Sequence, residues 1–373
     1  MQPEKPASPL AVLPLISVNG MPFISVRTDS APAHLWLIDS GFQVSVVNAR
    51  FATLLHVQTQ GRRKVAVPGG QIDVGRVPGI PLHLQNITYT PDSLEVIDLH
   101  HVEPLLGLAY AGILGHDFLT RYVTRIDYDN QRVELFEPST FVYAGPGKSL
   151  QVWIEAAQSF VLGILYSHGY ATPAKLKMDT GSLDALGLNG SFVEQSELVH
   201  GIERPLPATG AAIGGKVEAY VVRLDSIALS GTIIPKPIAG YSAETKRRGD
   251  AGTIGVALLS RFNLVFDYRR TRVIIETTVR SDRPMRYDGS GLFLTGTGPD
   301  YSEIAVVSVE SESSAAAAGI QPRDLILQID GTPVAQVGLS GTRSRLTMPG
   351  VVSLRIAHSG RARDVVLRLV ERL

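Results

Sequence analysis

Two short stretches with the same pattern decide how the rest of the chain is organised. Residues 37–41 read Leu-Ile-Asp-Ser-Gly, and residues 177–181 read Lys-Met-Asp-Thr-Gly. In each stretch a strand-like segment ends in an aspartate, which is followed by a hydroxyl residue and a glycine. The two aspartates, Asp39 and Asp179, define the spacing between the copies, which we call the repeat offset. One isolated copy of this motif is more often an ordinary turn, so its meaning depends on whether the repeat continues along the chain.

The same repeat offset relates a second pair of segments further along the chain. Residues 112–119 read Gly-Ile-Leu-Gly-His-Asp-Phe-Leu, and residues 252–259 read Gly-Thr-Ile-Gly-Val-Ala-Leu-Leu. The matching positions are Gly41 with Gly181, Gly115 with Gly255, Leu119 with Leu259, Arg121 with Arg261, Tyr122 with Phe262, Asp127-Tyr128 with Asp267-Tyr268 and Arg132-Val133 with Arg272-Val273. An internal duplication explains this register far better than chance. We therefore expect two similar halves, related by a pseudo-twofold axis, with one motif contributed by each half.

Short apolar segments alternate with turn residues in both halves, which predicts a mainly β fold. The dipeptide Asn19-Gly20 lies between two such segments and indicates a tight hairpin. Glycine-containing stretches at 68–70 and 214–215 are typical of hairpin tips. One or two helical turns are expected within residues 44–55 and again within 183–199.

The repeated motif has a chemical logic. Glycine leaves room beside the carboxylate, and neighbouring backbone N–H groups can hydrogen-bond to it. Two such loops facing each other would bring Asp39 and Asp179 within hydrogen-bond reach. Two like charges held that close share one proton and titrate as a unit. One carboxylate then acts as general base on a bound water, while the other donates a proton to the scissile carbonyl.

With both pairs of motifs in place, residues 10–280 resemble an aspartic protease of the retropepsin/pepsin class. Residues 39–41 and 179–181 match the catalytic loop of that family, and residues 113–115 and 253–255 match the strand threaded beneath the loop. Because each half is short, the chain resembles a retropepsin dimer fused into one polypeptide. The resemblance implies a mainly β, bilobal acid-protease fold, double-psi β-barrel-like, with pseudo-twofold symmetry.

The resemblance also assigns roles to individual residues. It implies that Asp39 and Asp179 are the catalytic dyad and that Ser40 and Thr180 interlock the two loops. The residues expected to support the dyad loops are Ser40, Gly41, Thr180, Gly181 and Ser182. Two hairpin flaps would close over an extended peptide substrate. The flap residues assigned to substrate binding are Gly69, Gly70, Gly214 and Gly215.

Several positions depart from the family pattern. The residue after the motif glycine is usually serine, which helps to keep one carboxylate ionised; Ser182 fits this pattern, whereas Phe42 does not. Phe42 could close an apolar wall around Asp39 and raise its pKa, so Asp179 is assigned as the more acidic partner. The first flap region, residues 63–77, has no tyrosine, which favours a retropepsin-like grip on the substrate. Asp127 and Asp267 also correspond in the repeat, but no water-binding loop accompanies them, and we interpret them as structural acids.

The last part of the chain, residues 285–373, resembles a PDZ domain. The resemblance rests on Ala-Ala-Ala-Ala-Gly-Ile at 315–320, Pro-Arg-Asp-Leu-Ile at 322–326 and Ile-Asp-Gly at 329–331. It implies a small β-sandwich with helices that captures a protein C-terminus by adding the peptide to the edge of a sheet. The peptide-binding residues would be Gly291, Leu292, Phe293 and Leu294, although this loop lacks the usual second glycine. The alternative is that the domain only packs against the two protease lobes.

Composition excludes several classes of function. Lys plus Arg and Asp plus Glu are equal at 35 each, so nucleic acid or an anionic membrane is not an expected partner. The chain has no cysteine, and its nine histidines show no metal-binding spacing, so neither a metal nor a cofactor is implied. No apolar run approaches the roughly 20 residues of a transmembrane helix. The N-terminus lacks the apolar core of a signal peptide, and we expect a periplasmic or other extracytoplasmic protein whose export signal has been removed.

These observations lead to one leading hypothesis and two alternatives. The leading hypothesis is an aspartic endopeptidase that acts on peptides or unfolded proteins and carries a PDZ domain for recognition. The first alternative is a catalytically weak or inactive peptide-binding protein that retains the protease fold. The second is an obligate dimer with sites between subunits, which two complete motifs in one chain make unnecessary. The expected domains are 1–145 for the N-terminal lobe, with 1–10 flexible, 146–280 for the C-terminal lobe and 281–373 for the PDZ domain.

Overall fold

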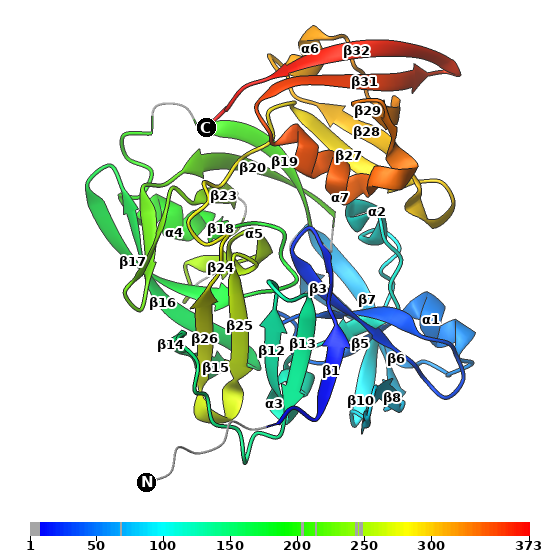
Figure 1. Cartoon of the computed structure of the whole chain (residues 1–373), viewed down its shortest axis with the longest axis vertical. Helices are drawn as coiled ribbons and strands as arrows, with labels where there is room; N and C mark the ends of the chain where they lie inside the picture. The colour runs from blue at the N-terminus through cyan, green and yellow to red at the C-terminus, as the bar shows by residue number, and fades with distance from the viewer. Residues whose placement is uncertain (1–7, 68, 203–204, 213–214, 243–244, 246–248) are drawn as a thin grey trace.

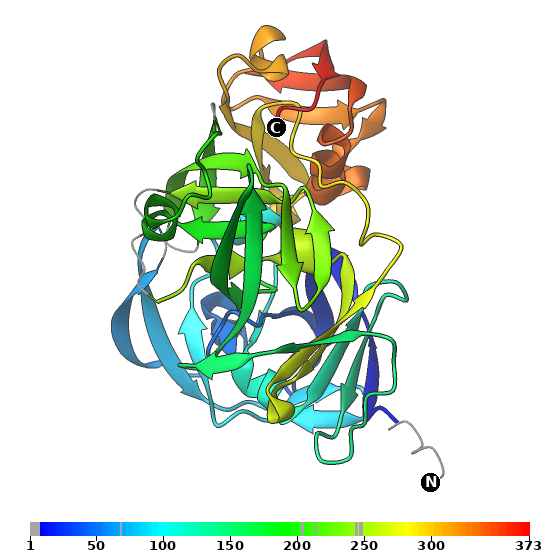
Figure 2. The same ribbon diagram turned by 90° about the vertical axis from the view of Figure 1, so that its left-hand side faces the viewer.

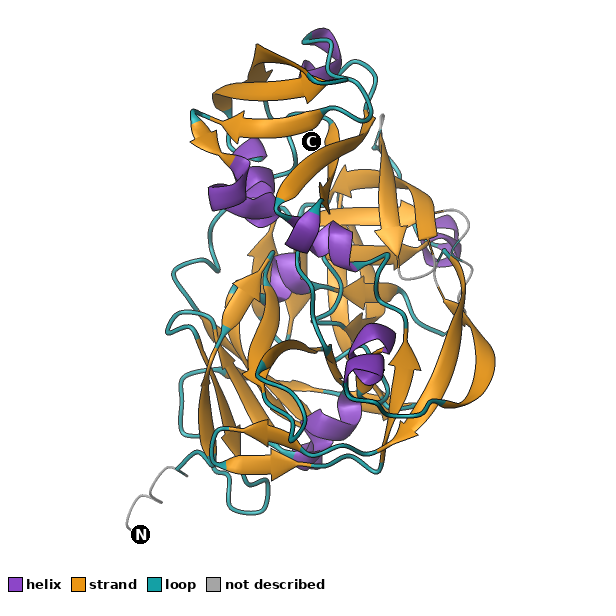
Figure 3. Cartoon of the chain, turned by 90° about the vertical axis from the view of Figure 1, so that its right-hand side faces the viewer, coloured by secondary structure: helices purple, strands orange, loops and turns teal. Residues whose placement is uncertain are grey.

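The computed structural model describes residues 8–67, 69–202, 205–212, 215–242, 245 and 249–373, so most of the segment 1–10 lies outside the described residues. The described part is mainly β, and its helices are short (Figure 3). The first and second halves of the chain lie side by side, and a smaller body formed by residues 292–369 lies at one end of both (Figures 1 and 2). None of the helices in these described ranges has the length and apolar character needed to cross a bilayer.

The first half is built on an eight-stranded sheet. In spatial order its strands are β2 (Ile16–Val18), β3 (Met21–Val26), β4 (His34–Ile38), β11 (Gly112–Leu114), β5 (Val46–Asn48), β10 (Ser93–Ile97), β7 (Gly70–Pro78) and β6 (Gln60–Val67). The other elements are the hairpin β8 (Leu82–Leu84) and β9 (Ile87–Tyr89) and the helices α1 (Ala49–Leu54), α2 (Glu103–Leu106) and α3 (His116–Arg121). The hairpin expected at Asn19-Gly20 forms between β2 and β3, with Val18 opposite Met21.

The second half is built on a ten-stranded sheet. In spatial order its strands are β19 (Leu206–Ala212), β20 (Gly215–Arg223), β23 (Ile238–Ser242), β18 (Leu186–Asn189), β24 (Gly252–Ile254), β17 (Tyr170–Met178), β16 (Gln158–Ser167), β21 (Ser226–Leu229) and β22 (Thr232–Pro235), with β15 (Trp153–Glu155) also paired to β16. Its helices are α4 (Gly190–Gln195) and α5 (Val256–Leu259).

The backbone repeats the duplication that the sequence shows. The order β4-β11-β5-β10-β7-β6 in the first half corresponds to β17-β24-β18-β23-β20-β19 in the second. In each half the strand that ends in the motif pairs in parallel with the threaded strand, with Ile113 opposite Leu37 and Thr253 opposite Lys177. Both parallel pairings therefore have the same register, related by the repeat offset. This pairing fixes the position where each motif strand ends, and so it fixes the position of the following aspartate.

A third sheet joins the two halves. Its strands, in spatial order, are β1 (Ala11–Pro14), β13 (Arg132–Phe136), β12 (Val123–Asp127), β25 (Phe262–Asp267), β26 (Arg272–Thr277) and β14 (Lys148–Gln151). The central pair, β12 and β25, contributes one strand from each half, with Ile126 opposite Leu264 (Figure 1). Buried apolar side chains of both halves form one continuous hydrophobic cluster. The two halves are thus fused through a shared sheet and a shared core.

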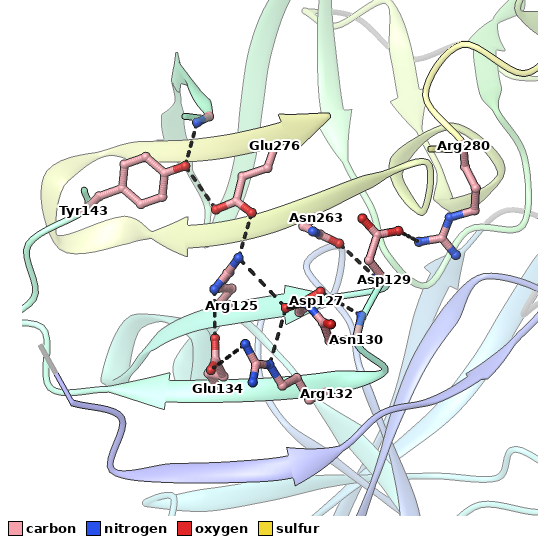
Figure 4. Close-up of polar contacts among 11 residues, drawn as sticks. Arg125, Asp127, Asp129, Asn130, Arg132, Glu134, Tyr143, Asn263, Glu276 and Arg280 are labelled. Atoms are coloured by element: carbon pink, nitrogen blue, oxygen red, sulfur yellow. Dashed lines mark hydrogen bonds and ion pairs between the residues drawn. The ribbon is translucent and has the colours of Figure 1, made fainter. Parts of the chain in front are cut away.

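Asp127 lies in a polar network within this shared sheet (Figure 4). Its carboxylate accepts hydrogen bonds from the backbone N–H of Asn130 at 3.0 Å and from its side-chain amide at 2.8 Å, and Arg132 lies 3.4 Å away. Arg125 in the same network binds Glu276 of the second half at 2.8 Å. In the second half, the buried Asp267 makes the corresponding contact with Arg272 at 2.9 Å. These contacts support the interpretation of both aspartates as structural.

The C-terminal body, residues 292–369, has a sheet and a hydrophobic core of its own. The strands are β27 (Leu292–Thr297), β28 (Glu303–Val309), β29 (Leu325–Ile329), β31 (Gly350–His358) and β32 (Arg361–Leu369), with β30 (Thr332–Pro333) paired to β29. The helices are α6 (Ser314–Ala317), α7 (Val334–Leu346) and the 3₁₀ turn η2 (Pro299–Tyr301); a further turn, η1 (Tyr268–Arg270), follows β25. Three residues of the alanine run at 315–318 lie in α6, and no helix was predicted over the residues of α7.

Candidate active site

The two motif loops are locked together by four hydrogen bonds arranged symmetrically. The backbone N–H of Ser40 donates to Thr180 Oγ1 at 3.0 Å, and the backbone N–H of Thr180 donates to Ser40 Oγ at 3.1 Å. Each hydroxyl then donates to the opposite strand end, Thr180 to the carbonyl of Ile38 at 2.7 Å and Ser40 to that of Met178 at 3.0 Å. Both hydroxyl residues are fully buried. The interlock that the resemblance implied for Ser40 and Thr180 is present.

The two carboxyl groups meet between these loops. Each accepts a hydrogen bond within its own loop, Asp39 from the N–H of Gly41 at 2.7 Å and Asp179 from the N–H of Gly181 at 3.0 Å. A Cβ placed on Gly41 would lie 2.3 Å from Asp179 Oδ2, and a Cβ on Gly181 would lie 2.0 Å from Asp39 Oδ2. Only glycine leaves room for the facing carboxylate at these two positions. The carboxyl groups are also close enough to hydrogen-bond to each other.

The electrostatic environments of the two acids differ. Asp39 is only 4% exposed, and this burial, together with the nearby negative charge of Asp179, raises the pKa of Asp39 well above its usual range. The ammonium group of Lys177 lies 2.7 Å from Asp179 Oδ2, and the two side chains are 12% and 14% exposed. The corresponding position in the first half is Leu37, which is apolar and buried. A proton shared by the pair is therefore held preferentially by Asp39.

Lys177 had no assigned role in the sequence analysis. Lys177 lies two residues before Asp179, and alternate side chains of a strand point to the same face. The sequence could therefore have predicted that Lys177 lies beside the Asp179 carboxylate. The two acids have unequal surroundings, and the side chain that contacts the Asp179 carboxylate is that of this lysine. Ser182 faces the threaded segment, since a Cβ on Gly255 would lie 3.0 Å from Ser182 Oγ. Phe42 is half-buried and packs against an apolar cluster that includes Leu37.

A buried tyrosine near both acids was also missed. The hydroxyl of Tyr268 is hydrogen-bonded to Ser159 at 2.8 Å, and its ring stacks on His116 with the ring centroids 4.9 Å apart. Burial raises the pKa of Tyr268, and the charges of Asp39 and Asp179 raise it further, so the phenol stays neutral. The repeat places Tyr268 and Tyr128 at matching positions, and the hydroxyl of Tyr128 only donates to a backbone carbonyl. The repeat alone therefore did not indicate which of the two tyrosines lies near the acids.

The two predicted flap tips contact each other. Gly69 lies at the turn between β6 and β7, and Gly70 begins β7. Gly215 begins β20 in the second hairpin, and a Cβ placed on it would lie 3.0 Å from the carbonyl oxygen of Gly69. Of the residues expected at the tips, Pro68 and Gly214 lie outside the described residues. Two hairpins from opposite halves therefore meet at the glycines that the sequence singled out.

In the C-terminal body, Gly291–Leu294 covers the turn before β27 and the first part of this edge strand. The N–H groups expected to receive a peptide carboxylate already have partners within the chain. That of Gly291 donates to Asp288 Oδ2 at 2.5 Å, and that of Leu292 donates to Ser290 Oγ at 3.1 Å. Across the part of the chain that the structure describes, no group of three or more His, Cys, Asp or Glu side chains is arranged to hold a metal ion.

Comparison with protein families matches residues 306–344 to the PDZ domain. The chain contains a PDZ domain. The matched stretch runs from within β28 to within α7, and it does not include the expected peptide-binding segment Gly291–Leu294. No curated protein matches the chain. A PDZ domain suggests recognition of a peptide or protein partner.

Proposed function

We propose that the chain is an aspartic endopeptidase that hydrolyses peptides or unfolded proteins at Asp39 and Asp179, with an acid-protease-like bilobal fold. The observation that carries this proposal is the meeting of two carboxyl groups within hydrogen-bond reach on interlocked loops, with the pKa of one raised by burial. The two equivalent sheets and the contact between the hairpins of the two halves support it. An extended peptide would lie between those hairpins and the carboxyl pair.

The proposed mechanism divides the work between the two acids. Asp179, with the ammonium group of Lys177 beside it, removes a proton from a water molecule whose oxygen bonds to the carbonyl carbon of the peptide. Asp39, held protonated by burial, donates its proton to the carbonyl oxygen, which gives a neutral tetrahedral intermediate. The proton taken up by Asp179 then passes to the amide nitrogen, and the C–N bond breaks. A proton returning from the intermediate to Asp39 completes the carboxylic acid product and restores the pair.

Lys177 sets the pH range of this chemistry, and its replacement by leucine, the residue at the corresponding position 37, tests its role. The positive charge lowers the pKa of Asp39, so its removal raises that pKa further. We expect the basic limb of the profile of kcat/KM against pH, where Asp39 loses its proton, to move upward by about one unit or more in Lys177→Leu. Lys177→Arg keeps the charge and should stay near the wild-type profile. An unchanged profile in the leucine variant would show that the ammonium group does not tune the pair.

The proposal itself is tested by incubating the full chain with an unfolded protein over pH 3 to 8 and identifying new peptide termini by mass spectrometry. New internal termini are expected, and none at any pH would contradict the proposal. The alternative, a peptide-binding protein without catalytic activity, is favoured by the same Lys177 contact, because the ion pair occupies an oxygen of the carboxylate that would have to accept a proton from water. In that case a labelled peptide would bind to the full chain and remain intact.

A further inference from the structure

In the PDZ domain, strand β27 and helix α7 lie side by side and face the rest of the chain. β27 is the edge strand of its sheet, and α7 packs against β27. Figure 1 shows α2, which belongs to the first half of the chain, directly beneath this pair. An edge strand beside a helix is where PDZ domains bind their peptides. The segment in that position here is α2.

The contacts of α2 with the PDZ domain are at backbone distance. Gly107 ends α2 in a left-handed conformation, and a Cβ placed on it would lie 2.8 Å from Cβ of Leu339 in α7. A Cβ placed on Gly296 in β27 would lie 3.0 Å from Cα of Gly107 and 3.3 Å from the carbonyl oxygen of Pro104. Glycine on both sides thus allows the helix to sit close to the strand and to α7.

Polar groups of the PDZ domain also bind this segment. Arg343 in α7 donates one hydrogen bond to the carbonyl of Leu105 at 2.6 Å and another to that of Leu294 at 2.7 Å, so its guanidinium joins α2 to β27. The first bond satisfies a carbonyl in the last turn of α2, where no partner exists within the helix. The hydroxyl of Tyr301 donates to Glu103 Oε2 at 2.8 Å.

Glu103 connects α2 to the threaded strand of the first half. This fully buried carboxylate accepts hydrogen bonds from Asn48 Nδ2 at 3.0 Å and from the backbone N–H of Tyr110 at 3.2 Å, and it is paired with Arg50. Tyr110 lies two residues before β11, whose last carbonyl, that of Leu114, accepts the backbone N–H of Asp39 at 2.9 Å. The clamped helix is therefore anchored to the strand beneath the acid pair.

We propose that the groove between β27 and α7 is an interaction site whose resident ligand is the chain's own α2 segment, and that an external peptide binds there only by displacing α2. The internal partners of the Gly291 and Leu292 N–H groups agree with a ligand that is an internal segment and has no terminal carboxylate. The PDZ domain then acts as a clamp on the first half. This inference does not depend on peptide-bond cleavage.

Gly296→Ala tests the clamp through hydrogen exchange of the full chain. The added methyl group would meet Gly107, Pro104 and Cβ of Tyr301, whose hydroxyl also binds the α2 segment. Gly341→Ala in α7 instead places its Cβ 2.7 Å from a side-chain atom of Val337 in the same helix. We expect exchange in residues 102–110 to become about tenfold faster or more in Gly296→Ala and to stay at the wild-type rate in Gly341→Ala. Equal protection of residues 102–110 in Gly296→Ala and in the wild type would overturn the proposal.

A binding measurement tests the groove itself. The probe is a fluorescein-labelled, C-terminally amidated peptide of residues 99–110. Gly107→Ala in the full chain should release α2 while leaving the groove intact, so the peptide should bind this variant about tenfold more tightly than the wild type. Gly107→Ala combined with Gly296→Ala, which also obstructs the groove, should abolish the gain. Equal binding to the wild type and Gly107→Ala, or retained binding to the double variant, would contradict the proposal.

Discussion

Asp39→Asn and Asp179→Asn should each lower the cleavage rate of an unfolded protein by about a thousandfold or more, the scale of losing a general acid or base. Asparagine keeps the shape of the side chain, and its carbonyl oxygen can still accept the hydrogen bond that each acid receives within its own loop. It cannot hold or release the shared proton, so water is no longer activated. Initial rates of the two variants and the wild type, measured over pH 3 to 8, give the comparison.

Two further measurements distinguish lost chemistry from lost folding. Circular dichroism should show wild-type secondary structure in both variants, because the four hydrogen bonds between Ser40, Thr180 and the strand ends do not involve the carboxylates. A statine-type mimic of the tetrahedral intermediate should bind the wild type and lose affinity for both variants. Wild-type turnover in either variant would show that the dyad assignment is wrong.

Gly181→Ala should both inactivate the protein and destabilise it. The new Cβ would lie 2.0 Å from Asp39 Oδ2, a distance that forces one of the two interlocked loops to move. Overpacking of this kind costs on the order of 1–3 kcal/mol of unfolding free energy, and the buried, hydrogen-bonded surroundings favour the upper end. Urea denaturation followed by tryptophan fluorescence measures the change, and cleavage of the unfolded substrate measures the activity.

Gly240→Ala is the matched control for this prediction. Gly240 lies in β23 of the same half, and the nearest atom to a Cβ placed there is the carbonyl oxygen of Leu186 at 4.0 Å. This variant should retain activity and most of the stability. If Gly181→Ala were as stable and as active as Gly240→Ala, the close approach of the Asp39 carboxylate to the opposite loop would not exist in solution.

Much of the duplicated part could be predicted because its signals are local and repeated. The repeat offset predicted the pairing of Asp39 with Asp179, and the same offset relates the parallel registers of β4 with β11 and of β17 with β24. The Asn19-Gly20 hairpin followed from turn chemistry alone. Such features depend on neighbours in the chain, so a single sequence contains them.

Two helices at the interface with the PDZ domain could not be predicted. α2 has only four residues, too few to show a periodic pattern. α7 is the longest helix of the described residues, but it contains Gly338, which is left-handed, and Gly341, so its propensity is low. Both helices are stabilised by tertiary packing, which overrides local preference.

The sequence by itself determined the duplicated architecture, the two aspartates and the glycines beside them, because a motif and its repeat are local patterns. Only the tertiary structure decided how unequal the pair is. Lys177 stands against Asp179, Asp39 is buried, and Tyr268 lies near both. It also decided that α2, a helix from the first half of the chain, lies against β27 and α7 of the PDZ domain. The charge beside an acid, its burial and the segment that lies in the PDZ groove all depend on contacts between residues far apart in the chain. No local sequence pattern specifies such contacts.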